Sequence, residues 1–478
     1  MEHFDFAPET RRQSLAFLLP KLEAFFAQTA SLPVSKAWDR EKIKQHARSF
    51  SLKSSQKPEA VLEQILTGLT EQAIHSPHPG YLGLFNPRAN FASALAELIS
   101  GVFNPQLAAW GHAPFANEIE QYLIEEFGVR FGYMREQTDG TFCSGGAESN
   151  LTAVLAALNH RFPAFHAKGL TSVNQPLRMY VSVESHHSIV KAAKVTGLGS
   201  EVVREIPVTA TLQMDTEQLE AAILLDMESG FCPLMLVGTS GTTGAGAMDN
   251  LVELGKIARK YGMWFHVDAA YGGASILSNR TQRAFRGIEQ SDSITLDAHK
   301  WFSTGMGASL FLTSHPGILQ QSFRIQTGYM PPREQEHAPI DPYEHSLQWS
   351  RRFIGLKLYL PLAIHGWKGY RQVIERQMDL GDYLRNRIRN AGWEILNFTK
   401  LPVICFTHAA FPDEISVRRL VEKLNRTGQF WVSAYPVRGR WGIRVCISNY
   451  NTDESLLREF LDQLTRNIQQ VAPVSHPH

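Results

Sequence analysis

Short, nearly continuous apolar runs alternate with longer amphipathic stretches through the middle of the chain. The apolar runs are short and rich in β-branched and aromatic residues, so each predicts a buried strand. The predicted strands are 178–183, 233–238, 263–268, 293–297 and 308–313, and the predicted helices are 147–160, 188–196, 215–228 and 250–261. Asp249, directly before the last helix, is predicted to cap it. This alternation predicts an α/β fold with a mostly parallel sheet flanked by helices.

The two ends of the chain follow different patterns. The N-terminal stretch has apolar residues at helical spacing (Leu15, Leu18, Leu19, Leu22), and a second helix is predicted to start at Pro58. The Pro/Gly/His cluster at 76–80 predicts a boundary. Beyond it, 350–367 predicts a long helix, and 402–406 and 442–447 predict strands. The predicted division is a helical segment at 1–75, a large α/β domain at 76–349 and a small α+β domain at 350–478.

Composition excludes several classes of protein. Lys plus Arg number 47 against 46 acidic residues, so the net charge of +1 argues against nucleic acid or a charged membrane surface as a partner. No apolar run is long enough to span a bilayer, and the first residues lack the pattern of a signal peptide. Four widely separated cysteines form neither a disulfide nor a zinc pattern. These features predict a cytoplasmic protein without a metal site.

Lys300 is the most informative candidate for chemistry. It follows the predicted strand at 293–297 and precedes Trp301 and Phe302. A lysine at the mouth of a core strand is well placed to form a Schiff base, because desolvation favours its neutral amine. By itself the run is more often that of a surface lysine whose stem lies along apolar neighbours.

A small-residue loop precedes the predicted helix at 147–160. Its sequence is Cys143-Ser-Gly-Gly-Ala147, and the glycines allow the backbone to approach an anion closely. The free N–H groups at a helix N-terminus then favour a phosphate. An ordinary tight turn has the same composition.

Two further polar residues follow apolar strands. Asp268 ends the predicted strand at 263–268, and a buried carboxylate needs a partner such as a protonated pyridine nitrogen. Alternatively, Asp268 caps the following turn, or it binds a metal ion together with His266. His186 follows the predicted strand at 178–183 and is able to lie flat against a planar ring, or to cap the next helix from the surface.

The order of these motifs along the chain is anion loop, ring-stacking histidine, carboxylate and lysine. The histidine, the carboxylate and the lysine each lie at or just after the end of a predicted strand, where open α/β sheets bind their ligands. Pyridoxal 5′-phosphate (PLP) requires a lysine, a partner for its pyridinium, a cover for its ring and a phosphate site. Together the motifs therefore predict a PLP pocket.

From about His75 to about Thr452 the chain resembles the group II PLP-dependent amino-acid decarboxylases. The shared motifs are His-Val-Asp-Ala-Ala-Tyr at 266–271, Asp-Ala-His-Lys-Trp at 297–301, His-x-Ser-x-x-Lys-Ala at 186–192, Gly-Thr-Thr at 241–243 and Ser-Arg-Arg-Phe at 350–353. The resemblance implies the PLP-dependent transferase fold type I, with a seven-stranded sheet, a helical N-terminal segment and a small C-terminal domain. It also implies a homodimer in which the N-terminal segment wraps the partner, although the same apolar stripe is able to pack within one chain.

Site residues are implied position by position. Lys300 would form the internal aldimine, Asp268 would pair with the pyridine nitrogen and His186 would stack on the ring. The remaining cofactor contacts would be Gly146 and Ala147 at the phosphate, Thr243 near the ring hydroxyl, Ala270 under the ring and His299 beside lysine and substrate. Asp297 stands where several relatives contact phosphate, and it is left unassigned because a carboxylate would repel phosphate.

A polar stretch from about 328 to 342 is rich in proline and predicts a long loop of the kind that often acts as a lid. In the resembling family a tyrosine on this loop reprotonates the substrate, usually from the neighbouring subunit, and Tyr329 matches it. Relatives that form aldehydes tend to have phenylalanine there, so Tyr329 favours simple decarboxylation. A tyrosine merely exposed on the loop is the alternative.

The predicted activity is decarboxylation of an L-amino acid to its amine and carbon dioxide. The main alternative is another PLP reaction on the same fold: aldehyde formation, transamination or carbon–carbon cleavage. A cofactor-free binding protein and a metalloenzyme built on His266 and Asp268 are more distant. Substrate-lining candidates are Phe85, Asn86, Trp110 and His299, with Trp110 equally suited to a core. Asn86, Gln106 and Ala108 depart from the bulky apolar residues of aromatic decarboxylases, so the substrate is left open.

Overall fold

The computed structural model describes residues 4–325 and 339–471. Its large sheet has the strand order β1-β7-β6-β5-β4-β2-β3, and only β7 runs against the other strands. This sheet confirms the predicted mostly parallel α/β architecture. Its strands are β1 (Asp139–Cys143), β2 (Leu177–Ser182), β3 (Val203–Ile206), β4 (Cys232–Thr239), β5 (Trp264–Asp268), β6 (Ser293–Asp297) and β7 (Ser309–Thr313).

Helices cover both faces of this sheet, which explains why its central strands are apolar throughout. Successive residues of a strand alternate between the two faces. Leu310 and Leu312 join a core with α5, α9, α10 and α12, whereas Phe311 joins a core with α6, α8 and α11. The bounds are α5 (Pro114–Phe131), α6 (Gly146–Arg161), α7 (Phe165–Lys168), α8 (Ser188–Val195), α9 (Thr216–Glu228), α10 (Leu251–Lys260), α11 (Ile318–Phe323) and α12 (Leu356–Asn390).

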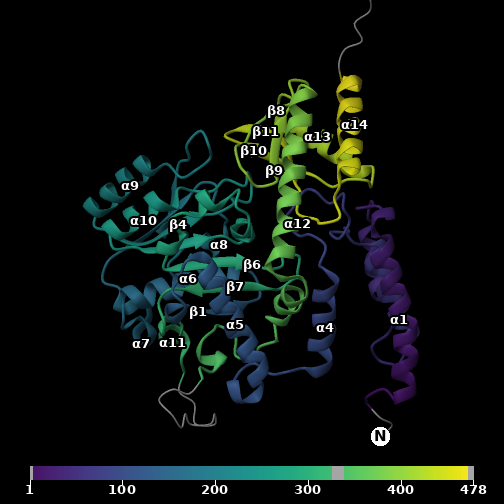
Figure 1. Cartoon of the computed structure of the whole chain (residues 1–478), viewed down its shortest axis with the longest axis horizontal. Helices are drawn as coiled ribbons and strands as arrows, with labels where there is room; N and C mark the ends of the chain where they lie inside the picture. Colours follow the sequence, from purple (N-terminus) through teal and green to yellow (C-terminus); the bar gives the residue numbers. More distant parts are fainter. Residues whose placement is uncertain (1–3, 326–338, 472–478) are drawn as a thin grey trace, which may run out of the picture.

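The small C-terminal sheet has the order β10-β11-β9-β8 and is antiparallel. It forms a second core with α13, α14 and the later part of α12, above the large sheet in Figure 1. The predicted strands at 402–406 and 442–447 are both present. The bounds are β8 (Glu394–Ile395), β9 (Val403–Thr407), β10 (Ser433–Val437), β11 (Arg440–Cys446), α13 (Glu414–Arg426) and α14 (Glu454–Val471).

The N-terminal helices lie to one side of the sheet. They are α1 (Pro8–Gln28), α2 (Arg40–Ala47), α3 (Pro58–Glu71) and α4 (Phe91–Phe103). In Figure 1, α1 stands at the outer edge and α4 runs between α1 and α12. None of the residues of α1 is fully buried, and Leu15, Leu19 and Leu22 of its apolar stripe stay exposed, so the described structure covers this stripe only in part.

Two predictions about helix starts are wrong in detail. Asn250, not Asp249, caps α10, since its side chain accepts the N–H of Glu253. Asp249 is buried and accepts the N–H groups of Met214 and Thr239, which joins two loops. The helix predicted from Ser350 begins at Leu356, because Arg351 is buried in an ion pair with Glu120 and holds the preceding segment outside the helix.

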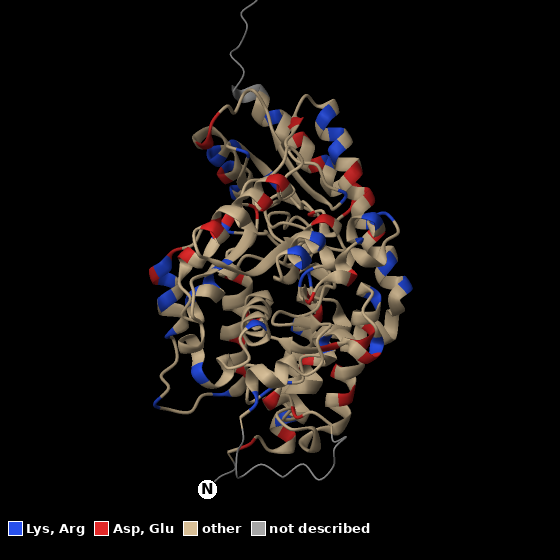
Figure 2. Cartoon of the chain, turned by 90° about the vertical axis from the view of Figure 1, so that its left-hand side faces the viewer, with Lys and Arg blue, Asp and Glu red and all other residues tan. Residues whose placement is uncertain are grey.

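The surface carries charges of both signs. Figure 2 shows Lys and Arg interspersed with Asp and Glu on the helices of the face that it displays, in keeping with the net charge near zero. Within residues 4–325 and 339–471, no helix has the length and apolar character needed to cross a bilayer.

Candidate active site

A cavity of about 200 Å³ lies at the carboxyl ends of β4, β5 and β6, beside the N-terminus of α6. Most of the site residues predicted from the sequence line it, although they come from separate segments of the chain. These are Gly146, Ala147, His186, Thr243, Asp268, Ala270 and Lys300. Residues that sequence reasoning did not assign also line it: Asn150, Ser188, Thr239, Gly241, Tyr271 and Asp297.

Lys300 and Asp297 form an ion pair inside this cavity. Lys300 Nζ lies 3.0 Å from Asp297 Oδ2, with side chains that are 20% and 3% exposed. Ser309 Oγ donates a hydrogen bond of 2.5 Å to the other oxygen of Asp297. The carboxylate that the sequence left unassigned therefore neutralises the lysine proposed to react.

The N-terminus of α6 forms the cradle predicted for an anion. Gly145 precedes the helix, and the N–H groups of Gly146 and Ala147 belong to its first turn, where no helical acceptor is available. A Cβ atom on Gly146 would lie only 2.9 Å from Asp297 Oδ2. The loop therefore requires glycine at 146 because the backbone passes against a buried side chain.

Asp268 is buried at the end of β5, as predicted, and each of its oxygens accepts a hydrogen bond. Asn150 Nδ2 donates to Oδ2 at 2.9 Å, and the N–H of Ala270 donates to Oδ1 at 3.1 Å. Neither donor is a cation, so the remaining lone pairs of this carboxylate suit a positively charged group in the cavity.

His186 lies on the turn between β2 and α8. Burial lowers its pKa, while the nearby carboxylate of Asp268 acts in the opposite direction. Its Nδ1 accepts the backbone N–H of Ser188 at 3.2 Å and lies 2.8 Å from Ser188 Oγ. The ring is therefore neutral near pH 7 and carries its proton on Nε2.

His299 is buried behind the lysine and does not line the cavity. Its Nδ1 lies 2.8 Å from the carbonyl oxygen of Ala308, and its Nε2 lies 3.8 Å from Asp297 Oδ2. Burial lowers the pKa of His299, although Asp297 opposes this effect. In this structure it packs beside Asp297 rather than facing the cavity.

The substrate-lining candidates are not brought together. Phe85 stacks on Tyr271 with ring centroids 3.6 Å apart, and Lys300 Nζ lies 5.9 Å from its centroid. Asn86 donates to Met306 Sδ. Trp110 lines a separate cavity, where its Nε1 donates to Glu118, so within one chain it lies apart from Lys300.

Tyr329 and most of the predicted loop at 328–342 lie outside the described residues. The loop ends where Pro342 and the following residues form a short turn of helix. Within the described part of the chain, no group of three or more His, Cys, Asp or Glu residues is arranged to hold a metal ion. His266 instead faces Ser293 Oγ and Asn150 Oδ1.

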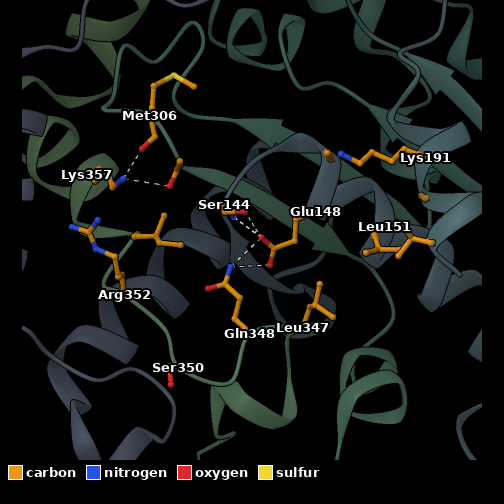
Figure 3. Close-up of a pocket in the computed structure, with 15 residues that line it drawn as sticks. Ser144, Glu148, Leu151, Lys191, Met306, Leu347, Gln348, Ser350, Arg352 and Lys357 are labelled. Atoms are coloured by element: carbon orange, nitrogen blue, oxygen red, sulfur yellow. Dashed lines mark hydrogen bonds between the residues drawn. The ribbon is translucent and has the colours of Figure 1, made fainter. Parts of the chain in front are cut away.

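A larger cavity of about 660 Å³ shares Ala147 with the first cavity and opens beside the anion loop. Figure 3 shows Glu148 at its floor, held by Ser144 and by Gln348 Nε2 at 2.8 Å. Its rim is formed by exposed apolar side chains, namely Val195, Met306 and Leu347.

Comparison with known proteins identifies the family. Residues 44–409 match the model of the pyridoxal-dependent decarboxylase conserved domain. An aromatic-L-amino-acid decarboxylase of Bacillus atrophaeus is 25% identical over 94% of this chain and 93% of that protein. Tyrosine decarboxylase 2 of Narcissus pseudonarcissus is 28% identical over 85% of this chain and 84% of that protein.

Solved structures show the same fold. A crystal structure of Oryza sativa TDC with PLP and tryptamine superposes with a TM-score of 0.91 at 21% identity, covering 98% of this chain and 99% of that chain. Mouse CSAD superposes with a TM-score of 0.87 at 24% identity, covering 96% and 99%.

The chain belongs to the pyridoxal-dependent decarboxylase family. It has the fold type I architecture, its cofactor is pyridoxal 5′-phosphate, and its reaction class is that of a carboxy-lyase. The resemblance stated from the sequence motifs is confirmed.

Proposed function

We propose that the chain decarboxylates an L-amino acid to the corresponding amine and carbon dioxide, with Lys300 as the amine that bonds the cofactor. The observation that carries this proposal is the convergence of Lys300, Asp268 and His186 on one cavity at the N-terminus of α6. The cofactor supplies an electron sink for the bond that breaks. The chain's own residues must then bind the cofactor, orient the substrate and return a proton to the substrate carbon.

The residues present fit this cofactor. The α6 N-terminus offers the N–H groups of Gly146 and Ala147 to a phosphate. Asp268 would accept the proton-bearing ring nitrogen, and the neutral ring of His186 would lie flat against the pyridine. Thr243 and Ala270 also line the cavity, and they would lie near the ring hydroxyl and under the ring. The carboxylate of Asp297 also lies beside the cradle, and its pairing with Lys300 offsets its charge.

Asp268 carries the electrostatic part of the reaction. Held by Asn150 and Ala270, its carboxylate would keep a bound ring nitrogen protonated, which would favour breakage of the bond to the substrate carboxylate. Removing a preorganised charge of this kind costs on the order of 3 kcal/mol of transition-state stabilisation. We expect Asp268→Ala to lower kcat far more than it raises KM.

Proton return to the substrate carbon is assigned to Tyr329, with His186 as the second donor. The tautomer of His186 places a proton on Nε2, so that nitrogen is able to donate. We expect Tyr329→Phe to bind substrate but to release amine slowly, or to form some aldehyde. Unchanged amine production by this variant would show that Tyr329 is not the donor.

Arg444 is a further candidate for substrate binding that the sequence did not indicate. It is buried, its guanidinium lies 4.6 Å from the centroid of Phe85, and its Nη2 has no hydrogen-bond partner among the described residues. A buried guanidinium with a spare N–H suits a carboxylate. We expect Arg444→Lys to raise KM more than it lowers kcat. We also propose that Phe85, Asn86, Trp110 and His299 help to shape the substrate pocket.

The decisive test is product analysis on the purified protein with added cofactor. A screen of the common L-amino acids should include aromatic ones, because the relatives above are named for aromatic substrates. Amine and carbon dioxide in equal amounts would support the proposal, whereas a 2-oxo acid, or aldehyde with ammonia, would replace it by another PLP reaction. Lys300→Ala should lose the visible absorbance of the bound cofactor, and persistence of that band would refute the assignment of Lys300.

We also propose that the protein is a homodimer. Apolar side chains stand exposed along α4 and α1, including Val102 at 74%, Phe103 at 79% and Leu19 at 51%. The rim of the larger cavity adds Val195, Met306 and Leu347. Many large apolar side chains left exposed on one helix, as on α4, are typical of a protein interface. The resemblance to the family implies that Tyr329 of one copy would then serve the site of the other.

A further inference from the structure

Asn150 is the residue of the cavity whose role sequence reasoning did not address. It lies in the second turn of α6, is buried, and uses all four hydrogen-bonding positions of its amide. Its Nδ2 donates to Asp268 Oδ2 at 2.9 Å and to Ser188 Oγ at 2.7 Å. Its Oδ1 accepts from Thr295 Oγ1 at 2.9 Å and lies 3.0 Å from His266 Nε2.

These contacts fix the direction of every hydrogen bond in the network. Asp268 is an acceptor when ionised, so the amide must turn its Nδ2 toward it and its Oδ1 toward His266. His266 must then donate from Nε2, which leaves Nδ1 to accept from Ser293 Oγ at 2.8 Å. Ser293 Oγ in turn accepts from Trp264 Nε1 at 2.8 Å. A flipped amide would place its oxygen against the carboxylate of Asp268.

The second N–H of the same Nδ2 reaches His186 through Ser188. Because Asn150 donates to Ser188 Oγ, the hydroxyl proton of Ser188 is free to point at His186 Nδ1, 2.8 Å away. One amide group therefore connects the two side chains that would contact different parts of a bound ring: Asp268 at its nitrogen and His186 on its face.

We propose that Asn150 is a positioning residue that orients the carboxylate of Asp268 toward the ring nitrogen and sets the Nε2-protonated form of His186. The inference rests on the proposed function, since it concerns the same cofactor. It goes beyond that function because Asn150 itself needs no contact with substrate. Burial lowers the pKa of His266, so this neighbour stays neutral and its one ring proton, on Nε2, is donated to the amide oxygen of Asn150.

The experiment compares two ligands for the cofactor-free protein: pyridoxal phosphate, and the analogue in which C–H replaces the ring nitrogen. Wild type should bind pyridoxal phosphate more tightly than the analogue, because only pyridoxal phosphate pairs with Asp268. Asn150→Ala should bind pyridoxal phosphate about tenfold to a hundredfold more weakly, the range expected for a lost charge-assisted hydrogen bond. Its affinity for the analogue should stay within about twofold of wild type, since the analogue does not use the carboxylate.

Asn150→Asp is the second variant and keeps the shape of the side chain. It places an acceptor against Asp268 Oδ2, so it should weaken pyridoxal phosphate binding at least as much as Asn150→Ala does. Asn159→Ala is the matched control. It removes a buried amide from the same helix, where Asn159 Nδ2 donates to Leu155, and it should bind both ligands like wild type.

Parallel weakening of both ligands in the Asn150 variants would overturn the positioning role, since it would mean a general loss of structure. Unchanged affinity for pyridoxal phosphate would overturn it as well. A wild-type protein that binds neither ligand would instead overturn the proposed function, so the two failures are distinguishable.

Discussion

The close approach of Gly146 to Asp297 leads to a quantitative prediction about cofactor binding. A Cβ atom at 146 would lie 2.9 Å from Oδ2 and 3.1 Å from Oδ1 of Asp297. Asp297 has little freedom to move away, because Lys300 holds one oxygen at 3.0 Å and Ser309 holds the other at 2.5 Å. Gly146→Ala must therefore displace the backbone of the anion loop, and overpacking of this kind costs about 1–3 kcal/mol.

If that cost falls on the cradle, the dissociation constant for pyridoxal phosphate should rise about fivefold to a hundredfold in Gly146→Ala. Titration of the cofactor-free protein, followed by visible absorbance, measures this constant. Gly101→Ala is the control, because a Cβ there meets nothing within 4 Å. Wild-type affinity in Gly146→Ala would refute the steric reasoning.

A double-mutant cycle isolates the contact itself. Asp297→Ala removes the two oxygens that the new Cβ would meet, so Gly146→Ala should cost little in that background. The double variant should therefore bind pyridoxal phosphate much more tightly than the sum of the two single losses in binding free energy predicts. The difference should equal most of the loss that Gly146→Ala causes alone. Additive losses would show that glycine at 146 is required for a reason other than Asp297.

Three further predictions concern stability and assembly. Burial raises the pKa of Asp249 to about 6 from 3.8 in the unfolded chain. The folded state therefore binds this proton more tightly, so the group's contribution to stability is greatest below pH 3.8 and falls as pH rises through 6, by up to about 3 kcal/mol. In Asp249→Asn the melting temperature should therefore fall less between pH 4.5 and 7 than it does in wild type. An equal fall in both proteins would count against this role. Arg351→Met leaves the buried carboxylate of Glu120 unpaired and should cost about 3–5 kcal/mol, most of it recovered when Glu120→Gln is added. Equal melting temperatures for the single and double variants would contradict that pairing argument. Phe103→Asp on α4 should shift the protein toward monomers in sedimentation experiments, whereas Ile415→Asp, at a site 63% exposed on α13, should not. A dimer that survives Phe103→Asp would place the interface elsewhere.

The sequence predicted the central strands and the main site residues because both depend on local pattern. A parallel strand covered on both faces is apolar along its length, so apolar runs in the sequence predicted β4, β5 and β6. Asp268 ends the run of β5, and Lys300 follows the run of β6. β1 and β3 were missed for the same reason. β1 begins Asp-Gly-Thr and β3 reads Val-Arg-Glu-Ile, so neither has a continuous apolar pattern.

Side-chain partners that are distant in sequence could not be predicted in this way. The carboxylate of Asp268 and the amide of Asn150 are 118 residues apart in the chain, and only the packing of α6 against the sheet brings them together. The start of α12 was misplaced for a similar reason, since the helical pattern at 350–355 gives way to the buried pair of Arg351 with Glu120. Trp110 looked like a pocket residue by composition, but its place depends on the path of the chain before α5.

Asp297 shows most clearly why a local judgement about charge fails. Considered alone, a carboxylate beside a phosphate cradle would repel the phosphate, so Asp297 has no assigned role in the sequence-based prediction. In the folded chain its charge is offset by Lys300 from the next turn and by the hydroxyl of Ser309 from the adjacent strand β7. The N-terminus of α6 adds a partial positive charge on the same side. Whether a carboxylate opposes or supports anion binding is therefore decided by neighbours that tertiary structure supplies, so Asp297 belongs to the site as the residue that holds Lys300 in place.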